Sequence, residues 1–306
     1  MDLSSSKPIE IQDKPLFDNY FKRFPPEISE LTFTNLFMWR NHYDFRFTEY
    51  KNHLIIFSRE YLKKYGSFAI DSNNIFFLLP IGQNPGDLII ELFQNINNIE
   101  MHRVPEITIE EIRGDLTNNN LAILEDRNNW DYVYEKDSIE NLSGNKHRQN
   151  RRWLNKFLDS YNYKFNLLTE EWIEKSKELQ LEWCVMRGCE EDESLIEEQN
   201  AIHEALNHFS ELNFEGGIIC VENKCAAYTF GEMLNPNTLV IHIEKAHMDY
   251  EGSYQAINNF FLKNCCKNAI FVNREQDLGV LGLKRAKESY KPFRMVKKSV
   301  IFRNKS

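Results

Sequence analysis

Apolar residues along this chain follow a period of two in some stretches and a helical period in others. In the first half, alternating stretches with polar turns between them predict strands over residues 43–48, 53–58, 67–70, 75–79, 101–107 and 121–124. Helical spacing predicts helices over residues 17–24, 29–39 and 87–96, with another that begins at Ile109. Ser29 is the expected N-cap of the second of these helices.

The second half repeats this alternation of helices and strand pairs. Helices are predicted over residues 144–158, 170–186, 194–209, 255–264 and 283–290. Strands are predicted over residues 163–168, 216–221, 226–232, 239–245, 269–272 and 295–302. This order predicts an α+β (mixed α/β) fold, with a mostly antiparallel central sheet flanked by helices in each half.

The length of the chain and a change of pattern near residues 131–137 predict two domains. A chain of 306 residues is long for one core, and 42% hydrophobic and 13% aromatic residues suffice for two. We place the domains at residues 1–135 and 136–306. The net charge of −9 argues against a general nucleic-acid coat, so any RNA contact needs a local basic patch.

One polar segment offers the densest candidate chemistry. It runs from Asn273 to Pro292, directly after the predicted strand 269–272, and opens with N-R-E-Q-D. Proteins with α/β folds commonly bind ligands just past a strand end, beside a helix N-terminus. Within the segment, the carboxylate of Asp277 and three cations, Lys284, Arg285 and Lys287, lie within eleven residues. A solvated turn followed by a basic surface helix would have the same composition.

The segment 273–292 has the pattern N-x-E-Q-D-L-G-x-x-G-L-K-x-A-K-x-S-Y-x-P. In this pattern, and in residues 30–40, 142–157 and 217–232, the chain resembles the phosphatidylglycerol lysyltransferase C-terminal domain family in its stand-alone, membrane-free form. The resemblance covers nearly the whole chain. It implies two tandem GCN5-related acyltransferase-like (GNAT-like) domains, and we expect the second to carry the active site.

In GNAT enzymes that use acetyl-CoA, backbone N–H groups of a glycine-rich turn at a helix start bind the pyrophosphate. The equivalent turn of the first half contains Pro85, which removes one donor. In the second half Gly252 is present, but Tyr254 stands in the second small position, and Asp249 and Glu251 would repel phosphate. We therefore expect no cofactor, and CoA is the disfavoured alternative. We also expect a donor whose phosphates bind elsewhere in the protein.

The resemblance implies transfer of an aminoacyl group from aminoacyl-tRNA to a hydroxyl or amine acceptor, such as a lipid head group or a peptide. Attack on the ester carbonyl needs a proton acceptor, a group that stabilises the oxyanion, and groups that hold the ester. The catalytic candidates are Asp277, Lys284, Tyr290 and Glu232. The candidates for substrate binding are Asn273, Glu275, Gln276, Arg285, Lys287, Glu244, Gly252 and Ser253. Carboxylates near strand ends are otherwise ordinary surface residues.

The predicted helix 144–158 is the best candidate for contact with tRNA. Its cations are Lys146, Arg148, Arg151, Arg152 and Lys156. Trp153 is expected on the apolar side of the helix, and an aromatic side chain between cations suits nucleic acid. Residues 284–305 form a second basic segment, with nine Lys or Arg against one acid. A solvated helix face is the alternative interpretation of the first segment.

Two functions other than aminoacyl transfer remain open from the sequence. One is a non-catalytic binding module on a degenerate GNAT fold, and the other is a CoA-dependent N-acyltransferase with an unusual loop. We favour a transferase that uses aminoacyl-tRNA over both of these alternatives. Saturable CoA binding would favour the N-acyltransferase instead.

Cysteines and targeting segments change this picture little. The six cysteines, at 184, 189, 220, 225, 265 and 266, match neither a disulfide framework nor the common zinc knuckle, so we expect free or buried thiols and no metal site. The N-terminal residues lack the apolar core of a secretory signal, and no apolar run approaches the roughly 20 residues that span a bilayer. We expect a cytoplasmic protein without a transmembrane segment.

Overall fold

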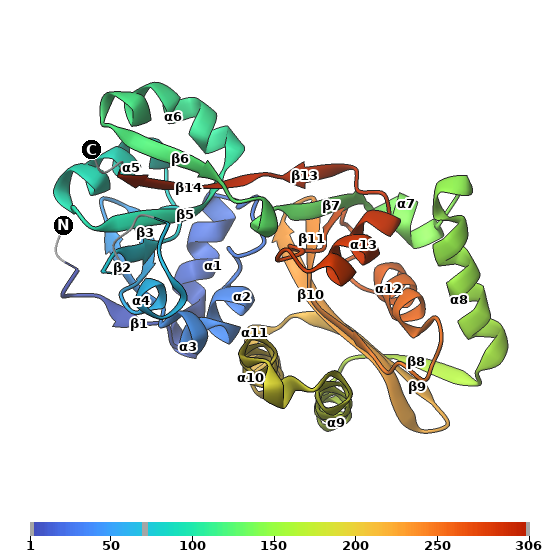
Figure 1. Ribbon diagram of the computed structural model, residues 1–306. Helices are drawn as coiled ribbons and strands as arrows, with labels where there is room; N and C mark the ends of the chain where they lie inside the picture. Colours follow the sequence, from blue (N-terminus) through green and yellow to red (C-terminus); the bar gives the residue numbers. More distant parts are fainter. Residues whose placement is uncertain (1–2, 69–72, 304–306) are drawn as a thin grey trace. The chain divides into compact units, whose positions relative to one another are not determined.

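The computed structural model describes residues 3–68 and 73–303. The chain forms two compact units, one from the described parts of Met1–Asp131 and Val296–Ser306, the other from Tyr132–Met295. Within the described residues, each unit is built on one seven-stranded, mostly antiparallel sheet with helices against it (Figure 1). The predicted fold class is confirmed. None of the helices in the described part of the chain is both long and apolar enough to cross a bilayer.

The first sheet has the strand order β1-β2-β3-β4-β5-β14-β6. Its strands are β1 (Lys7–Pro8), β2 (Arg46–Tyr50), β3 (His53–Ser58), β4 (Ile75–Phe77), β5 (Ile99–Pro105), β14 (Lys298–Arg303) and β6 (Leu121–Glu125). Lys51 and Asn52 both have positive φ, which suits the tight turn of the β2–β3 hairpin. β4 and β5 are parallel, and α5 (Pro85–Asn95) connects them.

Helices cover both faces of the first sheet. α5 and α6 (Glu106–Asn118) pack on one face, where Phe57, Phe77 and Ile301 are part of the same buried cluster. On the other face, Phe17 of α1 (Lys14–Arg23) contacts Phe33 of α2 (Phe33–Met38) and Phe47 of β2. The remaining short helices of this unit are α3 (Arg40–Tyr43), α4 (Tyr61–Tyr65) and the 3-10 turns Ile11–Asp13 and Arg127–Asn129.

The second sheet has the order β13-β7-β12-β11-β10-β9-β8. Its strands are β13 (Arg294–Val296), β7 (Asp131–Glu135), β12 (Phe271–Asn273), β11 (Thr238–Ala246), β10 (Lys224–Asn235), β9 (Glu215–Val221) and β8 (Tyr163–Leu167). β11 and β12 are parallel and are connected by α12 (Ser253–Asn264). The two units therefore share one plan, in which a parallel pair joined by a helix lies within an otherwise antiparallel sheet.

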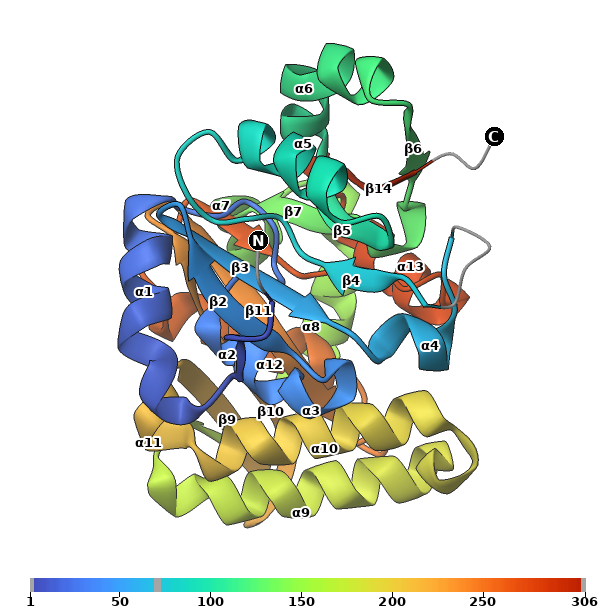
Figure 2. The same ribbon diagram turned by 90° about the vertical axis from the view of Figure 1, so that its left-hand side faces the viewer.

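Alternate residues of β10 face opposite helix layers of the second unit. Ala227 belongs to the buried cluster under α12 and α8 (Arg148–Ser160), whereas Tyr228 donates a hydrogen bond to Gln180 of α9 (Glu170–Arg187). α9 and α10 (Glu193–Asn207) lie side by side on the face opposite α12 (Figures 1 and 2). The other helices here are α7 (Lys136–Asn141), α11 (Phe209–Leu212), α13 (Leu281–Ser289) and the 3-10 turns Asn145–His147 and Cys189–Glu191.

The strand predicted over residues 295–302 of the second half is two strands, and only the first of them, β13, lies in the second sheet. The final strand, β14, belongs to the first sheet. β14 pairs with β5 on one side and with β6 on the other, antiparallel to both. β7, which follows β6 in the chain, pairs with β12 in the second sheet. The pattern of residues 295–302 predicts a strand, but it carries no information about which neighbours that strand will have.

Two local predictions in the first unit differ from the structure. Thr32, not Ser29, caps α2 by accepting a hydrogen bond from the Asn35 N–H, because the Ser29 hydroxyl donates to the buried carboxylate of Asp131. The predicted strand 67–70 lies partly outside the described residues, and Ser67 and Phe68 are not in a strand.

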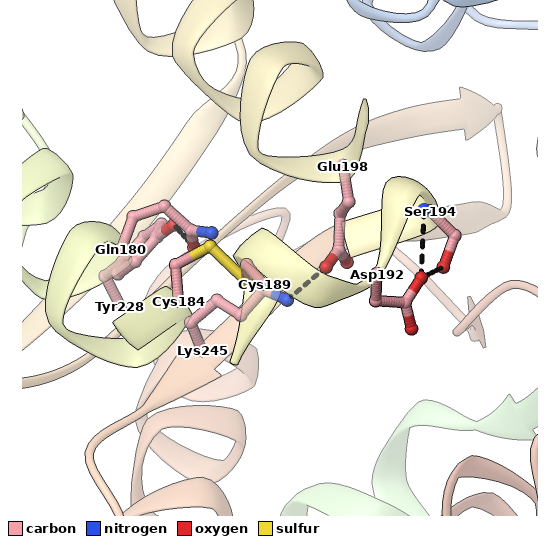
Figure 3. Close-up of a disulfide and its surroundings, with 8 residues drawn as sticks. All are labelled: Gln180, Cys184, Cys189, Asp192, Ser194, Glu198, Tyr228 and Lys245. Carbon is pink, nitrogen blue, oxygen red and sulfur yellow. Dashed lines mark hydrogen bonds and ion pairs between the residues drawn. A yellow bond between two sulfur atoms is a disulfide. The ribbon is translucent and has the colours of Figure 1, made fainter. Parts of the chain in front are cut away.

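The expectation of free thiols is wrong for one pair of cysteines. Cys184 of α9 and Cys189 form a disulfide, with Cα atoms 5.1 Å apart (Figure 3). Gly188 between them has φ 66°, a left-handed conformation that ends α9 and turns the chain back toward Cys184. The other cysteines are free, namely Cys220, Cys225, Cys265 and Cys266. The disulfide thus ties the end of α9 to the turn that leads into α10.

Candidate active site

The candidate site lies where the parallel strands of the second sheet stop pairing. The β11–β12 ladder ends at Val240 and Asn273, and β11 continues to Ala246 without β12 beside it. A register shift in the β10–β11 pairing, between Phe230 and Gly231, leaves His242 without a residue opposite. Such a bulge redirects a side chain. Five residues lie on β10 and β11 or directly after β12 in this region, and we call them the strand-end cluster: Glu232, His242, Glu244, Arg274 and Glu275.

His242 lies between two carboxylates from different elements. Its Nε2 is 3.0 Å from Glu232 Oε1 on β10, and its Nδ1 is 2.9 Å from Glu275 Oε1, two residues past the end of β12. The His242 side chain is 1% exposed, whereas those of Glu232 and Glu275 are 18% and 19% exposed. The imidazole is therefore enclosed, and the carboxylates connect it to the surface.

The pKa of His242 differs from that of an ordinary histidine. Burial alone would lower this pKa, but the hydrogen bonds to the carboxylates of Glu232 and Glu275 outweigh burial and raise the pKa to about 9. The ring is therefore a cation at neutral pH. It holds two carboxylates in place and is not itself available as a proton acceptor.

This shifted pKa predicts a pH-dependent contribution to stability. The folded-state pKa, about 9, lies above the unfolded value near 6.5, so the contribution is complete below about pH 6.5 and is lost as pH rises through 9. Urea unfolding of the wild-type chain and of His242→Asn should differ by about 3 kcal/mol near pH 6.5, with the gap closing above pH 9. An equal gap at both pH values would contradict the charged state of His242.

Arg274 brings a second charged pair to the strand-end cluster. Its Nη2 is 2.8 Å from Glu244 Oε1, and its guanidinium lies 4.6 Å from the centroid of the Tyr290 ring. Burial would lower the pKa of Arg274, but the Glu244 carboxylate and the phenols of Tyr290 and Tyr134 raise it. The Nη1 atom is buried and has no hydrogen-bond acceptor among the described residues. Arg274 therefore has one hydrogen-bond donor, Nη1, that no acceptor in the described part of the chain uses.

Glu244 and Tyr290 both contact this arginine. Glu244 Oε2 accepts a hydrogen bond of 2.9 Å from Asn258 Nδ2 on α12, so both of its oxygens are occupied. Tyr290 is 4% exposed, and burial raises the pKa of its phenol above the ordinary value. These two predicted site residues therefore contact Arg274 and help to hold its guanidinium in place.

The structure places Asp277 and Asn273 inside the turn that follows β12. Asp277 is 1% exposed and accepts hydrogen bonds from the Tyr132 hydroxyl, at 2.6 Å, and from the Gly279 N–H, at 2.9 Å. Asn273 is fully buried and accepts from the Glu275 N–H at 2.8 Å. Both side chains fix the backbone that carries Arg274 and Glu275, including the positive φ of Glu275.

The predicted cations of α13 have different surroundings. Lys287 Nζ donates to the backbone carbonyl of Arg274, so it also helps to position the cluster. Lys284 and Gln276 are half-buried, and Arg285 is exposed. The predicted roles of Lys284 and Arg285 in binding and catalysis stay predictions.

The predicted phosphate turn at the start of α12 is filled by the protein itself. Gly252 has φ 85°, and a Cβ there would lie 2.2 Å from the Trp153 carbonyl oxygen of α8. The Glu251 N–H donates to the Tyr161 hydroxyl at 3.1 Å, and the Ser253 hydroxyl donates to the His247 carbonyl. Lys156 forms an ion pair with Glu251. α8 therefore packs directly against this turn.

α8 presents its remaining predicted cations to solvent. Arg148 and Arg152 of α8 are exposed, as is Lys146 in the 3-10 turn just before it, whereas Arg151 donates to the carbonyls of Leu142 and Gly144. Trp153 was expected on the apolar face, but 36% of it is exposed, because Leu154 and Phe157 fill the buried face. The basic surface of α8 thus includes an accessible aromatic ring.

The equivalent position in the first unit is closed. The β4–β5 ladder ends at Phe77 and Met101, and two residues further Arg103 has φ 59°, just as Glu275 has φ 56° two residues past Asn273. Arg103 is 9% exposed and is paired with Glu30 and Asp126. A buried ion-pair network therefore fills the place where the second unit carries partly exposed carboxylates.

Comparison with known proteins identifies the family. A family model described as phosphatidylglycerol lysyltransferase, C-terminal, matches residues 21–302. The chain belongs to this family. The predicted family and its tandem GNAT-like acyltransferase fold are thereby confirmed.

Solved structures and a curated relative are also similar to this chain. A conserved protein of unknown function from Bacteroides thetaiotaomicron superposes with a TM-score of 0.88 at 27% identity, covering 98% of this chain and 99% of that one. L-PGS from Bacillus licheniformis has a TM-score of 0.66 at 14% identity, with 96% and 93% covered. An uncharacterised protein of Mycoplasmoides gallisepticum is 24% identical over 225 residues, 70% of this chain and 69% of that protein.

Two residues of the strand-end cluster were missed from the sequence. His242 stands in an alternating strand between two apolar residues, and nothing local distinguishes it from a core histidine. Arg274 lies inside the polar segment whose neighbours were nominated, but only its pairing with Glu244 shows that it belongs to the cluster. The signal for Arg274 was present, since it stands between two nominated positions.

Proposed function

We propose that this phosphatidylglycerol lysyltransferase-like chain is an aminoacyltransferase that moves an aminoacyl group from aminoacyl-tRNA to a hydroxyl or amine acceptor, at the strand-end cluster of its second unit. The observation that carries the proposal is the combination of a partly exposed carboxylate, Glu232, with the buried Nη1 atom of Arg274, which has no hydrogen-bond acceptor among the described residues. Acyl transfer from an ester needs these two functions, a proton acceptor and an oxyanion donor.

The reaction assigns one role to each member of the cluster. The acceptor O–H or N–H attacks the ester carbonyl, and Glu232 takes its proton. Electrons move onto the carbonyl oxygen, and Arg274 Nη1 donates to this oxyanion. Collapse of the tetrahedral intermediate breaks the bond to the ribose oxygen, which leaves as a hydroxyl after taking the proton from Glu232. Glu275 and the protonated His242 hold Glu232 in position.

Two features support aminoacyl-tRNA rather than CoA as the donor. The turn before α12 has no room at Gly252, where the Trp153 carbonyl lies close, and the Glu251 N–H is already used. A pyrophosphate bound there would meet the carbonyl oxygen of Trp153 and the carboxylates of Asp249 and Glu251. α8, in contrast, presents exposed cations beside an accessible tryptophan, which fits a polyanion with stackable bases.

A transfer assay tests the proposal. The chain is incubated with bulk tRNA charged with labelled amino acids, with and without membrane lipid extract, and parallel samples receive labelled acetyl-CoA. The expected result is tRNA-dependent transfer of label into an acceptor fraction and no transfer from acetyl-CoA. Transfer from acetyl-CoA would overturn the proposal, and tRNA binding without any transfer would show a non-catalytic binding module.

The basic surface of α8 carries its own prediction. The double substitution Arg148→Gln/Arg152→Gln should weaken tRNA binding by roughly tenfold at moderate salt. It should also reduce the slope of log K against log salt by about 0.7 to 0.9 for each phosphate that these arginines neutralise. Filter binding over a salt series measures both quantities. Arg113→Gln, an exposed arginine on α6 of the first unit, is the matched control. Equal weakening in both proteins would mean that α8 has no special role.

A further inference from the structure

A pocket with a volume of about 470 Å³ opens in the second unit, beside the turn from β7 into α7, and we call it the β7–α7 pocket. Its apolar lining comes from the start of β12 and from the residue before β13. Ile270 and Phe293 are 56% and 57% exposed, and the ring of Phe293 stacks on that of Phe271 with centroids 5.6 Å apart. Large apolar side chains that gather in a concave site of this size are typical of a ligand pocket.

The backbone that carries this apolar lining is held by hydrogen bonds to β7 and to the start of α7. The Phe293 N–H donates to the Val133 carbonyl at 2.8 Å, and the Lys136 N–H donates to the Ile270 carbonyl at 2.9 Å. The pocket is therefore preformed, which lowers the entropic cost of binding a ligand.

Charged groups of both signs line the β7–α7 pocket. Glu135 and Asp137 supply carboxylates, and Lys146 supplies an ammonium group. Among the described residues, the side chains of Glu135 and Lys146 have neither a hydrogen bond nor an ion pair. Asp137 accepts a hydrogen bond from Asn141 through one oxygen, Oδ1. A ligand in this pocket would therefore find a negative and a positive group, both available.

A serine hydroxyl in the pocket is oriented by a buried histidine. His147 is fully buried, and its Nε2 lies 3.0 Å from Oγ of Ser138, which lines the pocket. Its Nδ1 is buried without a hydrogen-bond partner in the part of the chain that the structure describes. Burial, with the charges of Lys146 and Arg151, lowers the pKa of His147, so the ring is neutral.

The neutral ring carries one proton, and the unpartnered nitrogen decides where it lies. A buried N–H without an acceptor is rarer in proteins than a buried acceptor without a donor. We therefore assign the proton of His147 to Nε2, which donates to the Ser138 oxygen. The Ser138 O–H is then free to donate to a ligand.

We propose that the β7–α7 pocket binds a zwitterion with an apolar side chain, either a free α-amino acid or a short peptide with free ends. The ammonium group of this ligand would meet Glu135 and Asp137. Its carboxylate would meet Lys146 and the Ser138 hydroxyl, because charge-assisted hydrogen bonds are the strong ones. Its side chain would pack on the exposed ring of Phe293.

The charges of the pocket favour this ligand over a nucleotide. A nucleotide base could stack on the same aromatic ring, but its phosphate would meet two carboxylates and only one cation of the lining. None of the residues that line the pocket belongs to the strand-end cluster. The proposed ligand site is therefore separate from the proposed transfer reaction and does not rest on it.

Isothermal titration calorimetry of the full chain, without tRNA or lipid, tests this site. The probes are free phenylalanine, the dipeptide leucyl-phenylalanine, and the same dipeptide with its N-terminus acetylated or its C-terminus amidated. We expect saturable binding of the dipeptide or of free phenylalanine, and at least about tenfold weaker binding of the dipeptide when either end is blocked. Comparison of the two unblocked probes shows which form the pocket takes.

Two substitutions in the pocket have matched controls elsewhere in the chain. Phe293→Ser should weaken binding by about tenfold, because it removes the ring that contacts the ligand side chain. Glu135→Gln should weaken binding by about tenfold, because it removes a charge that faces the ammonium group. The controls are Phe68→Ser, at a ring 49% exposed in the first unit, and Glu178→Gln, at an exposed position of α9. Both controls should bind like the wild-type chain.

Several results would overturn the proposal. They are absence of binding of every probe, undiminished binding of the blocked dipeptides, and equal weakening in Phe293→Ser and Phe68→Ser. Tighter binding of adenosine monophosphate than of either unblocked probe would instead assign the pocket to a nucleotide. A concentration-dependent dimer that disappears in Phe293→Ser would assign it to a second copy of the chain. Each of these results would leave the proposed transfer reaction standing.

Discussion

Glu232→Gln is expected to reduce aminoacyl transfer by roughly a thousandfold, within the range of about 10² to 10⁴ that a positioned general base contributes. Glutamine keeps the shape of the side chain and an oxygen that can face His242, but it cannot accept the proton of the attacking nucleophile. The loss should appear in kcat, because the amide still lines the same site. The measurement is the steady-state rate of label transfer from charged tRNA, with unfolding curves to show that the variant is folded.

Glu275→Gln is the matched comparison for this prediction. Glu275 is the other carboxylate that is hydrogen-bonded to His242, and its distance from the ring and its exposure are nearly those of Glu232. The substitution therefore changes the charge around His242 in the same way. Its expected loss of activity is about tenfold, because Glu275 positions His242 and does not take the proton. A larger loss in Glu275→Gln than in Glu232→Gln would exchange the two roles and contradict our assignment.

Arg274→Lys should lower transfer by at least about a hundredfold, the effect of removing one donor to a developing oxyanion. Lysine retains the positive charge and therefore the attraction to Glu244. It lacks the second guanidinium nitrogen, Nη1, which takes no part in the ion pair with Glu244. Because the interaction strengthens as the oxyanion forms, the substitution should reduce kcat and leave tRNA binding unchanged.

Arg113→Lys on α6 is the control, since it makes the same chemical change at an exposed ion pair. Single-turnover rates for both variants, with tRNA affinity measured alongside, separate a catalytic defect from a binding defect. If Arg274→Lys transfers at the wild-type rate, or if its whole effect lies in tRNA affinity, Arg274 has no role in stabilising the oxyanion.

The sequence predicted the elements of the fold better than their connections. The strand pairs, the helices and the two-unit plan follow from local hydrophobic periods, and the family pattern after Asn273 locates one wall of the candidate site. Pairing partners are not local properties. The insertion of β14 between β5 and β6, and the bulge in the β10–β11 pairing at His242, depend on residues outside each strand's own sequence.

The same limit applies to single side chains. Glu232 and Glu275 were nominated from their positions near strand ends, and the structure brings both to His242. Asp277 was nominated from the same logic, but the structure encloses its carboxylate with Tyr132 and Gly279. Whether a carboxylate at a strand end faces solvent or its own turn depends on the neighbouring strand, β7, which begins more than a hundred residues earlier in the chain.

The position of β14 has a consequence for the order in which the protein is made. Synthesis delivers β5 and β6 early, but the strand that joins them is made only after the whole of the second unit. Until then the first sheet has two unpaired inner edges, which are prone to bind other extended segments. The strands of the second sheet all precede β14 in the chain, so that sheet can be complete while the N-terminal unit still awaits β14.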